Sequence, residues 1–193
     1  MPLPHAQVGC IPKKLMHHAG NIGAMLHKDA EEYGWTGSEG AKHSWPALRQ
    51  LTGDYIHSLN FAYGVGLRAA GVTYAEARAQ FESPSSLLYT TAAGKQTRVS
   101  FDRAIVSTGG RPVQLPIPGA QLSITSDDLF WLKQAPGTTL VIGGGYIALE
   151  VGNTSISRAT TRSANLCDDA PCIVLRLARG STLRGGVRSL LCL

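Results

Sequence analysis

Cysteine, proline and long apolar runs are all scarce in this sequence. The 193 residues include 4 Cys and 10 Pro beside 22 Gly, which excludes a disulfide-stapled scaffold and a collagen-like chain. No apolar run approaches the roughly 20 residues of a membrane-spanning helix, so we expect no membrane partner. Residues 1–7 lack the features of a secretory signal or a transit peptide, so we expect no targeting segment in this chain.

Charged residues are also sparse, and the positive excess is confined to one end of the chain. The formal net charge of +5 arises mainly after residue 151, where six Arg occur with only Asp168 and Asp169. This tail contains no aromatic residue that could stack on bases, so we expect no nucleic-acid partner. The histidines lack the mutual spacing of metal ligands, so no metal site is expected either.

Hydrophobic periodicity and turn residues predict an α/β chain that begins with helices. Pro12 and an apolar stripe predict a helix over 13–28, and Ser44 is a suitable N-cap for a long helix ending near Gly71. The buried side of that second helix is expected to contain Leu48, Leu51, Tyr55, Leu59 and Ala62.

Strand patterns dominate the later part of the sequence. We predict a meander of strands over 72–82, 86–91 and 97–102, a buried strand over 103–108, a short helix capped by residues 126–128 that reaches Leu132, and a buried strand over 138–142. The Ser/Thr/Arg tract over 153–165 has few apolar side chains to offset the entropy of ordering it, so we expect no regular structure there. Residues 172–179 are again typical of a strand.

A glycine-rich segment follows the strand over 138–142. Gly143, Gly145 and Ala148 have the spacing of the GxGxxG/A fingerprint, in which the second Gly lets the backbone approach a pyrophosphate and the last small residue lets helix pack on strand. The helix N-terminus would offer N–H groups to phosphate. Glycine-rich strand ends are also common in protein cores, so a purely structural turn remains an alternative.

A cysteine stands at the start of the first predicted helix. Cys10 lies just before the helix N-terminus and three residues from Lys13, a position that would stabilise a thiolate and make it reactive. A buried structural cysteine is the alternative. Cys167 and Cys172 have the spacing of a redox disulfide, but the two Asp between them would disfavour thiolates, so we interpret this spacing as coincidence.

Six segments occur in an order that resembles a known family. They are Val8–Lys14, Tyr33–Trp35, Ser58–Asn60, Ser107–Pro112, Thr125–Leu132 and Val141–Glu150. Over residues 8–150 the chain resembles the large, animal-type thioredoxin reductases, which are pyridine nucleotide-disulfide oxidoreductases, and the segment from Thr125 is most similar to the mitochondrial form. The resemblance implies partial FAD- and NAD(P)-binding Rossmann-like domains with a small β-meander, incomplete at both ends: an FAD-binding part over 1–135 and the opening βα unit of an NADPH-binding part over 136–193.

The resemblance also implies which residues are catalytic. Family members pass a hydride from NADPH to FAD, and the reduced flavin opens a Cys-x-x-x-x-Cys disulfide. Cys10 matches the second cysteine of that pair, whereas His5 occupies the place of the first. Lys13 matches a lysine near the flavin, and Glu150 matches the carboxylate that pairs with it. After Glu150 the family's apolar helix is expected to break off in an aberrant tail.

Cofactor-binding residues are implied in the same way. Tyr146 matches the aromatic that covers the flavin where nicotinamide docks, although a core aromatic is the alternative. Three further groups match family positions, namely the turn near FAD at Thr108, Gly109 and Gly110, the NADPH pyrophosphate loop at Gly143, Gly145 and Ala148, and the pair that binds the NADPH 2′-phosphate at Arg179 and Arg184. The two arginines are explained either by family sequence resuming after an inserted segment or by an unrelated tail.

These features predict a fragment of an NADPH-dependent, FAD-containing thioredoxin-disulfide reductase. As an isolated chain we expect it to be inactive, because a dithiol relay cannot close with one thiol. The alternatives are a glutathione reductase-type member of the family and a non-catalytic module that binds a nucleotide or a full-length subunit. Thioredoxin is the expected partner of the parent enzyme, members of the family form homodimers, and the expected location is mitochondrial or cytoplasmic.

Overall fold

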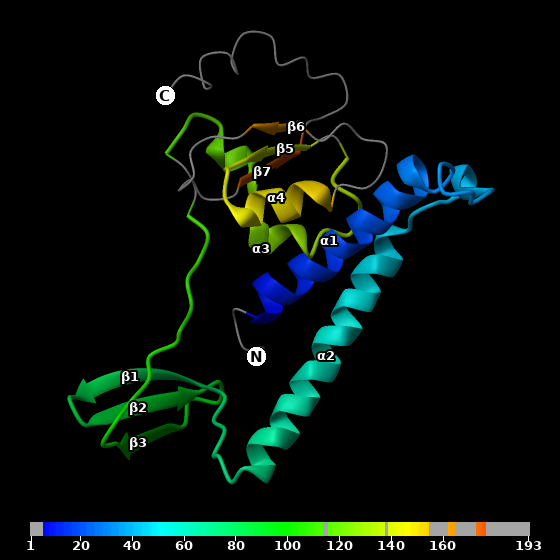
Figure 1. Cartoon of the computed structure of the whole chain (residues 1–193). Coiled ribbons are helices and arrows are strands. Elements are labelled where there is room, and N and C mark those ends of the chain that lie inside the picture. Colours follow the sequence, from blue (N-terminus) through cyan, green and yellow to red (C-terminus); the bar gives the residue numbers. More distant parts are fainter. Residues whose placement is uncertain (1–5, 114–115, 138, 155–161, 165–172, 177–193) are drawn as a thin grey trace. The chain divides into compact units, whose positions relative to one another are not determined.

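The computed structural model in Figure 1 describes residues 6–113, 116–137, 139–154, 162–164 and 173–176. They fall into two compact units. One unit spans His57–Gly109, and the other combines the described residues up to Ile56 with those from Gly110 onward. Both units contain helix and strand, and the predicted α/β class with a small meander is confirmed. The division into cofactor-binding parts at residue 135 stays a prediction.

An antiparallel meander forms the strand part of the His57–Gly109 unit. β1 (Ala77–Ser83), β2 (Ser86–Thr91) and β3 (Gln96–Ser100) pair in sequence order. Gly94 turns the chain between β2 and β3 with a φ of 79°, which glycine adopts without steric cost. The prediction for 86–91 is confirmed, whereas the first strand begins later than residue 72 because β2 offers only six residues to pair with.

The predicted buried strand over 103–108 is wrong. In the part of the chain that the structure describes, this segment belongs to no strand, and Ile105 and Val106 are 93% and 66% exposed. Branched apolar residues favour a strand only where a neighbouring strand takes up the backbone hydrogen bonds and covers the side chains. Among the described residues no such neighbour pairs with this segment.

A long first helix opens the other unit. α1 (Ile11–Ala24) continues a π-helical turn, η1 (Ala6–Cys10), and is followed by a second one, η2 (Met25–Asp29). Pro12 lies in the first turn of α1, where a residue without an N–H loses no intrahelical hydrogen bond. The predicted helix over 13–28 is therefore confirmed, with its beginning displaced toward the N-terminus.

The second long helix, α2 (Trp45–Ala69), begins in this unit and continues past Ile56 into the other. The predicted cap is confirmed, since the Ala47 N–H donates to Ser44 Oγ at 3.3 Å. The predicted buried side is wrong over the first turns. Trp45, Thr52 and Ile56 are buried, whereas Leu51 and Tyr55 are 57% and 48% exposed, because the large Trp45 ring enters the core and the residues seven and eleven positions later share its side of the helix.

The second sheet contains the glycine-rich segment. Its strand order is β4 (Ile124–Thr125), β7 (Ile173–Arg176), β5 (Thr139–Ile142) and β6 (Arg162–Ala164). β5 and β6 are parallel and are joined through α4 (Tyr146–Asn153), which makes a βαβ unit, whereas β7 is antiparallel to both of its neighbours. β7 lies inside the strand predicted for 172–179. The expectation of no regular structure over 153–165 is wrong at β6, because pairing with β5 needs backbone groups and no apolar side chains.

Two short helices precede this sheet, η3 (Ser38–Gly40) and η4 (Ala120–Leu122), and a third, α3 (Ser126–Leu129), follows β4. The cap of α3 is Thr125, one residue before the predicted position: the Thr125 N–H and hydroxyl both donate to Asp128 Oδ2 at 2.8 Å. This arrangement is a capping box. α3 ends at Leu129, which is buried, and so stops short of the predicted Leu132.

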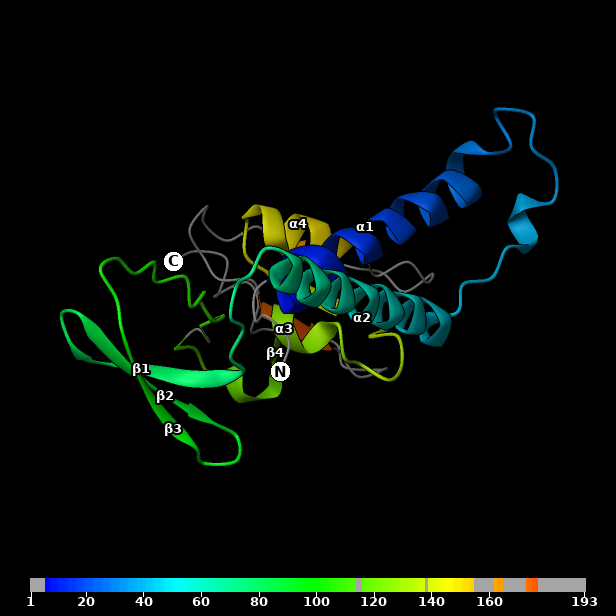
Figure 2. The ribbon, with the colours of Figure 1, turned by 90° about the horizontal axis from the view of Figure 1, so that it is seen from below.

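The core of this unit joins α1, α2, α3, α4 and β5. It is built from buried side chains of Met16, Trp45, Leu129, Phe130, Val141, Ala148 and Val151. Trp45 Nε1 donates to the Leu132 carbonyl at 2.8 Å, which satisfies the one polar atom of that side chain. Both views show α1 and α4 side by side (Figures 1 and 2). The core thus fixes the two helices that carry the candidate site.

Burial also explains why α4 is longer than expected. The helix does not stop after Glu150 but continues through Asn153. Val151 is 1% exposed in the core, and the Thr154 hydroxyl donates to the Val151 carbonyl at 2.5 Å. One helical turn of the divergent sequence is therefore built into the same fold.

Candidate functional site

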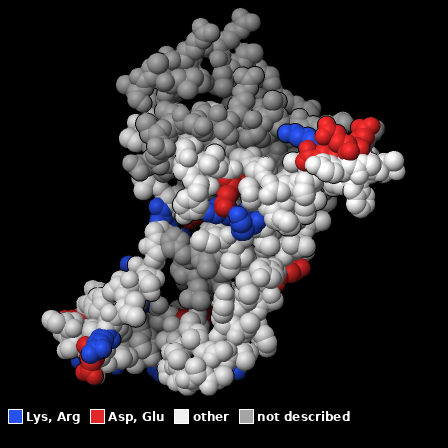
Figure 3. Space-filling model, in the orientation of Figure 1, with Lys and Arg blue, Asp and Glu red and all other residues white. Residues whose placement is uncertain are grey.

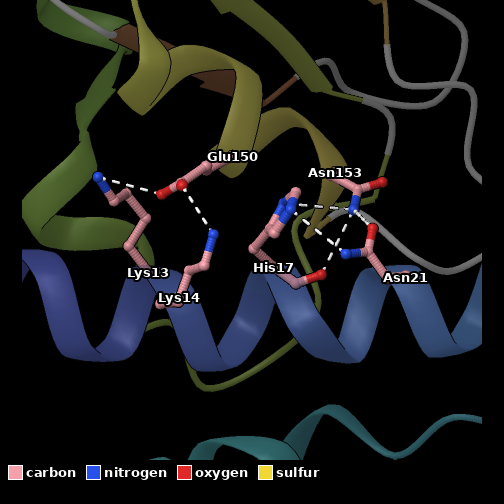
Figure 4. Close-up of polar contacts among 6 residues, drawn as sticks. All are labelled: Lys13, Lys14, His17, Asn21, Glu150 and Asn153. Carbon is pink, nitrogen blue, oxygen red and sulfur yellow. Dashed lines mark hydrogen bonds and ion pairs between the residues drawn. The ribbon is translucent and has the colours of Figure 1, made fainter.

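The packing of α1 on α4 brings together two charged residues that are far apart in the sequence. Lys13 Nζ lies 3.1 Å from Glu150 Oε2, and the two side chains are only 7% and 21% exposed (Figure 4). Lys13 is buried in the first turns of α1, and Glu150 is in the second turn of α4. A cation buried to this degree requires a counter-charge, and Glu150 supplies it. The pair that the resemblance implied is present, while its catalytic role stays a prediction.

A second lysine, for which no role was predicted, also pairs with the Glu150 carboxylate. Lys14 Nζ lies 3.2 Å from Glu150 Oε1 and is 68% exposed at its side chain. Burial raises the pKa of the Glu150 carboxyl, but the hydrogen bonds and charges of Lys13 and Lys14 together outweigh burial and hold that pKa below its ordinary value of 4.5. Glu150 is therefore ionised at neutral pH and accepts from both ammonium groups.

Tyr146 covers the ammonium of Lys13. Its ring centroid lies 4.1 Å from Lys13 Nζ, within the range of a cation–π contact. Tyr146 is the first residue of α4 and is 66% exposed, so it is not the core aromatic considered as an alternative. Lys13 thus has a carboxylate and an aromatic ring as partners.

The glycine turn lies immediately before Tyr146. Gly143 follows β5 with a φ of 130°, and Gly145 is the N-cap of α4. Ala148 is 4% exposed in the core, as the packing of a helix on its preceding strand requires of the third small residue in the motif. The strand, turn and helix of the fingerprint are therefore all present in the predicted order.

A polar seam continues from the lysines along the two helices. Asn153 Nδ2 donates to Asn21 Oδ1 at 2.7 Å and to the His17 carbonyl at 3.3 Å, and it lies 3.3 Å from His17 Nδ1 (Figure 4). His17 was not expected to be a metal ligand, and no role was predicted for Asn21 or Asn153. Spacing could have revealed them, since positions 13, 17 and 21 recur every four residues on α1 and positions 150 and 153 lie three apart on α4.

Cys10 differs from its expected placement. It is exposed and unbridged, and its backbone is helical with φ −61° and ψ −43°. Cys10 immediately precedes α1, as predicted, but it is also the last residue of η1, so the expectation that a helix begins only after it is wrong. The alternative of a buried structural cysteine is wrong as well.

The remaining predicted positions lie elsewhere. Thr108 and Gly109 belong to the other unit, and both are exposed, as is Gly110 at the boundary. Gly109 has a φ of 78°, in the left-handed region that glycine favours, and the tight turn stays a prediction. Five predicted positions lie outside the described residues: His5, Cys167, Cys172, Arg179 and Arg184. Their roles stay predictions.

A parallel βαβ unit, a glycine turn and a buried ion pair at the helix behind that turn are together typical of a nucleotide-dependent oxidoreductase. The family model for pyridine nucleotide-disulphide oxidoreductases matches residues 4–173, and the chain belongs to this family. Among similar proteins, the thioredoxin reductase SEP1 of Emiliania huxleyi is 45% identical over 144 residues. A thioredoxin reductase of Plasmodium falciparum (isolate FCH-5) is 42% identical over 147 residues.

The matched region covers 74% of this chain in both cases, but only 29% and 27% of those two proteins. The chain therefore spans less than a third of the length of either relative. These matches support membership of a thioredoxin reductase group, while the animal-type and mitochondrial assignments stay predictions. Within the described residues, no helix has the length and apolar character needed to cross a membrane, and no cluster of three metal-ligating side chains occurs.

The chemistry of the site fits the nucleotides that this family uses in general. Gly143 and Gly145 leave the turn without side chains where a pyrophosphate would approach, and α4 begins directly after it. The ammonium of Lys13 and the ring of Tyr146 suit a planar, electron-accepting ring system. The donor set is therefore compatible with flavin and nicotinamide nucleotides.

Proposed function

We propose that this chain is part of an NADPH-dependent, FAD-containing thioredoxin reductase. The observation that carries the proposal is the Lys13–Glu150 ion pair at 3.1 Å, which joins two positions that the family resemblance singles out and that lie 137 residues apart. FAD, when bound, supplies two-electron transfer between a nicotinamide and a disulfide. Glu150 holds the Lys13 ammonium in place, and the fixed ammonium favours negative charge that develops near it.

The other residues of the proposal bind or orient nucleotides. The turn from Gly143 to Gly145 and the first N–H groups of α4 would hold the NADPH pyrophosphate, and Ala148 lets the helix approach β5. Tyr146 would cover the ring system and exclude water from Lys13. Thr108, Gly109 and Gly110 would contact FAD, and Arg179 and Arg184 would bind the 2′-phosphate, for which guanidinium groups are well suited.

Catalysis by this chain alone is not part of the proposal. Cys10 supplies one thiol, and His5 stands where a partner thiol is required, so the motif before Lys13 lacks the dithiol that would exchange with thioredoxin. Thioredoxin is the proposed substrate of the complete enzyme, a homodimer is its proposed assembly, and a mitochondrial or cytoplasmic location is proposed on the resemblance.

Titration of the purified whole chain with NADPH tests the nucleotide site. We expect saturable heat on calorimetry, and at least tenfold weaker binding by Gly145→Val, because a branched side chain would stand where the pyrophosphate approaches. Gly40→Val is the matched control, since Gly40 is exposed with open space around it. Binding that is absent, or that both variants weaken equally, would overturn the proposal. Steady NADPH oxidation with a disulfide acceptor would contradict the expected inactivity.

A second candidate is a non-catalytic module that binds a nucleotide or a full-length reductase subunit. The observation that favours it is the same loss of one thiol, combined with an intact βαβ unit and ion pair. Co-purification of a full-length reductase with the tagged chain would support it, whereas NADPH binding by the chain is expected under both candidates.

A further inference from the structure

One amide nitrogen of α4 bridges two turns of α1. Asn153 Nδ2 donates to Asn21 Oδ1 at 2.7 Å and to the His17 carbonyl at 3.3 Å (Figure 4). The His17 carbonyl can only accept, so the atom of Asn153 that faces it is the nitrogen, and both of its hydrogens have an acceptor on α1. His17 and Asn21 are four residues apart, so these contacts hold successive turns of that helix.

Gly20 gives the Asn153 carboxamide its place between the two helices. A Cβ at position 20 would lie only 2.9 Å from Asn153 Nδ2, so any larger residue would displace the amide. Gly20 is buried and Asn153 is half-buried, so water competes little for the two hydrogen bonds. The amide is therefore held more firmly than one on an exposed helix surface.

Glu150 precedes Asn153 by three residues, on the neighbouring turn of the same side of α4. Its carboxylate meets two ammonium groups at once, Lys13 at 3.1 Å and Lys14 at 3.2 Å. A rotation of α4 about its axis would carry the carboxylate away from both. α4 has 8 residues and ends at Asn153, and a helix so short depends on tertiary contacts. The contacts that fasten its last turn therefore also fix the direction of Glu150.

We propose that Asn153 is a positioning residue for the candidate site: its carboxamide fixes the rotation of α4 and so holds the Glu150 carboxylate where it reaches Lys13 and Lys14. Asn153 acts on the ion pair through the helix backbone, because its own hydrogen bonds go to His17 and Asn21. The importance of the pair for redox chemistry rests on the proposed function, whereas the coupling between Asn153 and Glu150 is tested without a nucleotide.

A double-mutant cycle of Lys13→Met with Glu150→Gln measures how well the pair is aligned, and it is repeated in a background with Asn153→Leu. Leu has a similar branched outline but no donor. Urea unfolding of the whole chain at pH 7 should show that the coupling free energy between Lys13 and Glu150 falls to about half or less in this background. A merely structural asparagine would destabilise every chain of the cycle equally and leave the coupling unchanged, which would overturn the proposal.

Two controls separate this effect from a general one. Asn60→Leu alters an asparagine of α2 in the other unit and should leave the coupling unchanged; an equal loss there would overturn the proposal. Asn153→Asp and Asn21→Asp introduce the same charge at the two ends of the 2.7 Å hydrogen bond. Asn153→Asp removes the donor and should reduce the coupling, whereas Asn21→Asp keeps an acceptor and should retain most of it.

The two Asp variants keep the shape of the side chain, so they decide the question if Asn153→Leu does not fold. Equal effects of both would indicate charge alone and overturn the proposal. Calorimetry with NADPH separates this outcome from that of the proposed function. Reduced coupling in Asn153→Leu without NADPH binding by the unaltered chain would refute the proposed function and support the positioning role, whereas unchanged coupling with saturable NADPH binding would refute the positioning role alone.

Discussion

The backbone carbonyl of Asn153 lies against Gly20, in the space that a side chain at position 20 would fill. Gly20 is buried where α4 crosses α1. This close approach sets the distance between the helices, and it places Glu150, one turn earlier on α4, within reach of Lys13. The ion pair therefore depends on a glycine that carries no functional group.

Gly20→Ala should consequently destabilise the chain. Overpacking a tight contact costs roughly 1–3 kcal/mol, which exceeds the gain of about 0.5–1 kcal/mol from replacing a helical glycine by alanine. Gly53→Ala on α2 is the matched control, because Gly53 has no neighbouring atom within 4 Å and should show only the gain. Urea unfolding followed by circular dichroism measures both. Stabilisation by both substitutions would show that the helices are not in contact at Gly20.

Glu150→Gln should destabilise the fold more than Lys14→Met does. The amide would leave the buried Lys13 ammonium without a counter-charge, at a cost of about 1–3 kcal/mol. Lys14 is mostly exposed, and an exposed pair contributes only about 0.5 kcal/mol or less. A double-mutant cycle of Glu150→Gln with Lys13→Met isolates the coupling between the pair. A coupling free energy near zero would contradict the observed geometry.

Stability should fall in acid through Glu150. Its pKa is lower in the folded chain than the ordinary value of 4.5, so its contribution is complete above that value and is lost as the pH falls through the lower folded pKa. Urea midpoints between pH 7 and pH 3 measure this loss, and Glu150→Gln should make the curve flatter. Glu82, whose pKa the hydrogen bond from Arg98 also lowers, provides the comparison Glu82→Gln in the other unit. An unchanged slope in Glu150→Gln would refute the assignment.

Trp45→Phe should lower the free energy of unfolding by about 1–3 kcal/mol, because it leaves the Leu132 carbonyl without its donor and empties part of the core. Trp131→Phe alters a side chain that is 51% exposed and should change stability by less than about 0.5 kcal/mol. Denaturation monitored by tryptophan fluorescence measures both variants. Similar effects of the two substitutions would place Trp45 outside the core.

Local signals predicted local structure well. Ser44 caps α2, and the segment from Thr139 to Ala148 forms the strand, turn and helix that its spacing indicates. In each of these cases the residues that determine the conformation are close in sequence. Burial was predicted less well. Nothing in the periodicity of α2 indicates that Trp45 rather than Leu51 enters the core, because the partner surface comes from Leu129, Phe130 and other distant residues.

In the candidate site, too, the features that depend on distant residues were predicted less well than the local ones. The resemblance identified Lys13 and Glu150, but the contribution of Lys14 depends on how closely two helices approach, which composition and spacing do not encode. Asn153 was missed because the sequence after Glu150 was expected to leave the helix. The branched apolar residues at 105 and 106 led to the prediction of a strand that is not formed. Strand propensity predicts a strand whether or not a neighbouring strand pairs with it.

β5 is paired along both of its edges, with β7 on one side and β6 on the other. Both neighbours come from the segment after Glu150, which was expected to be an aberrant tail. Backbone amides of Leu140, Val141 and Ile142 should therefore be among the slowest in the chain to exchange with deuterium, and their protection should vanish when β6 and β7 are removed. Pairing with β6 and β7 thus holds in place the strand that leads into the glycine turn.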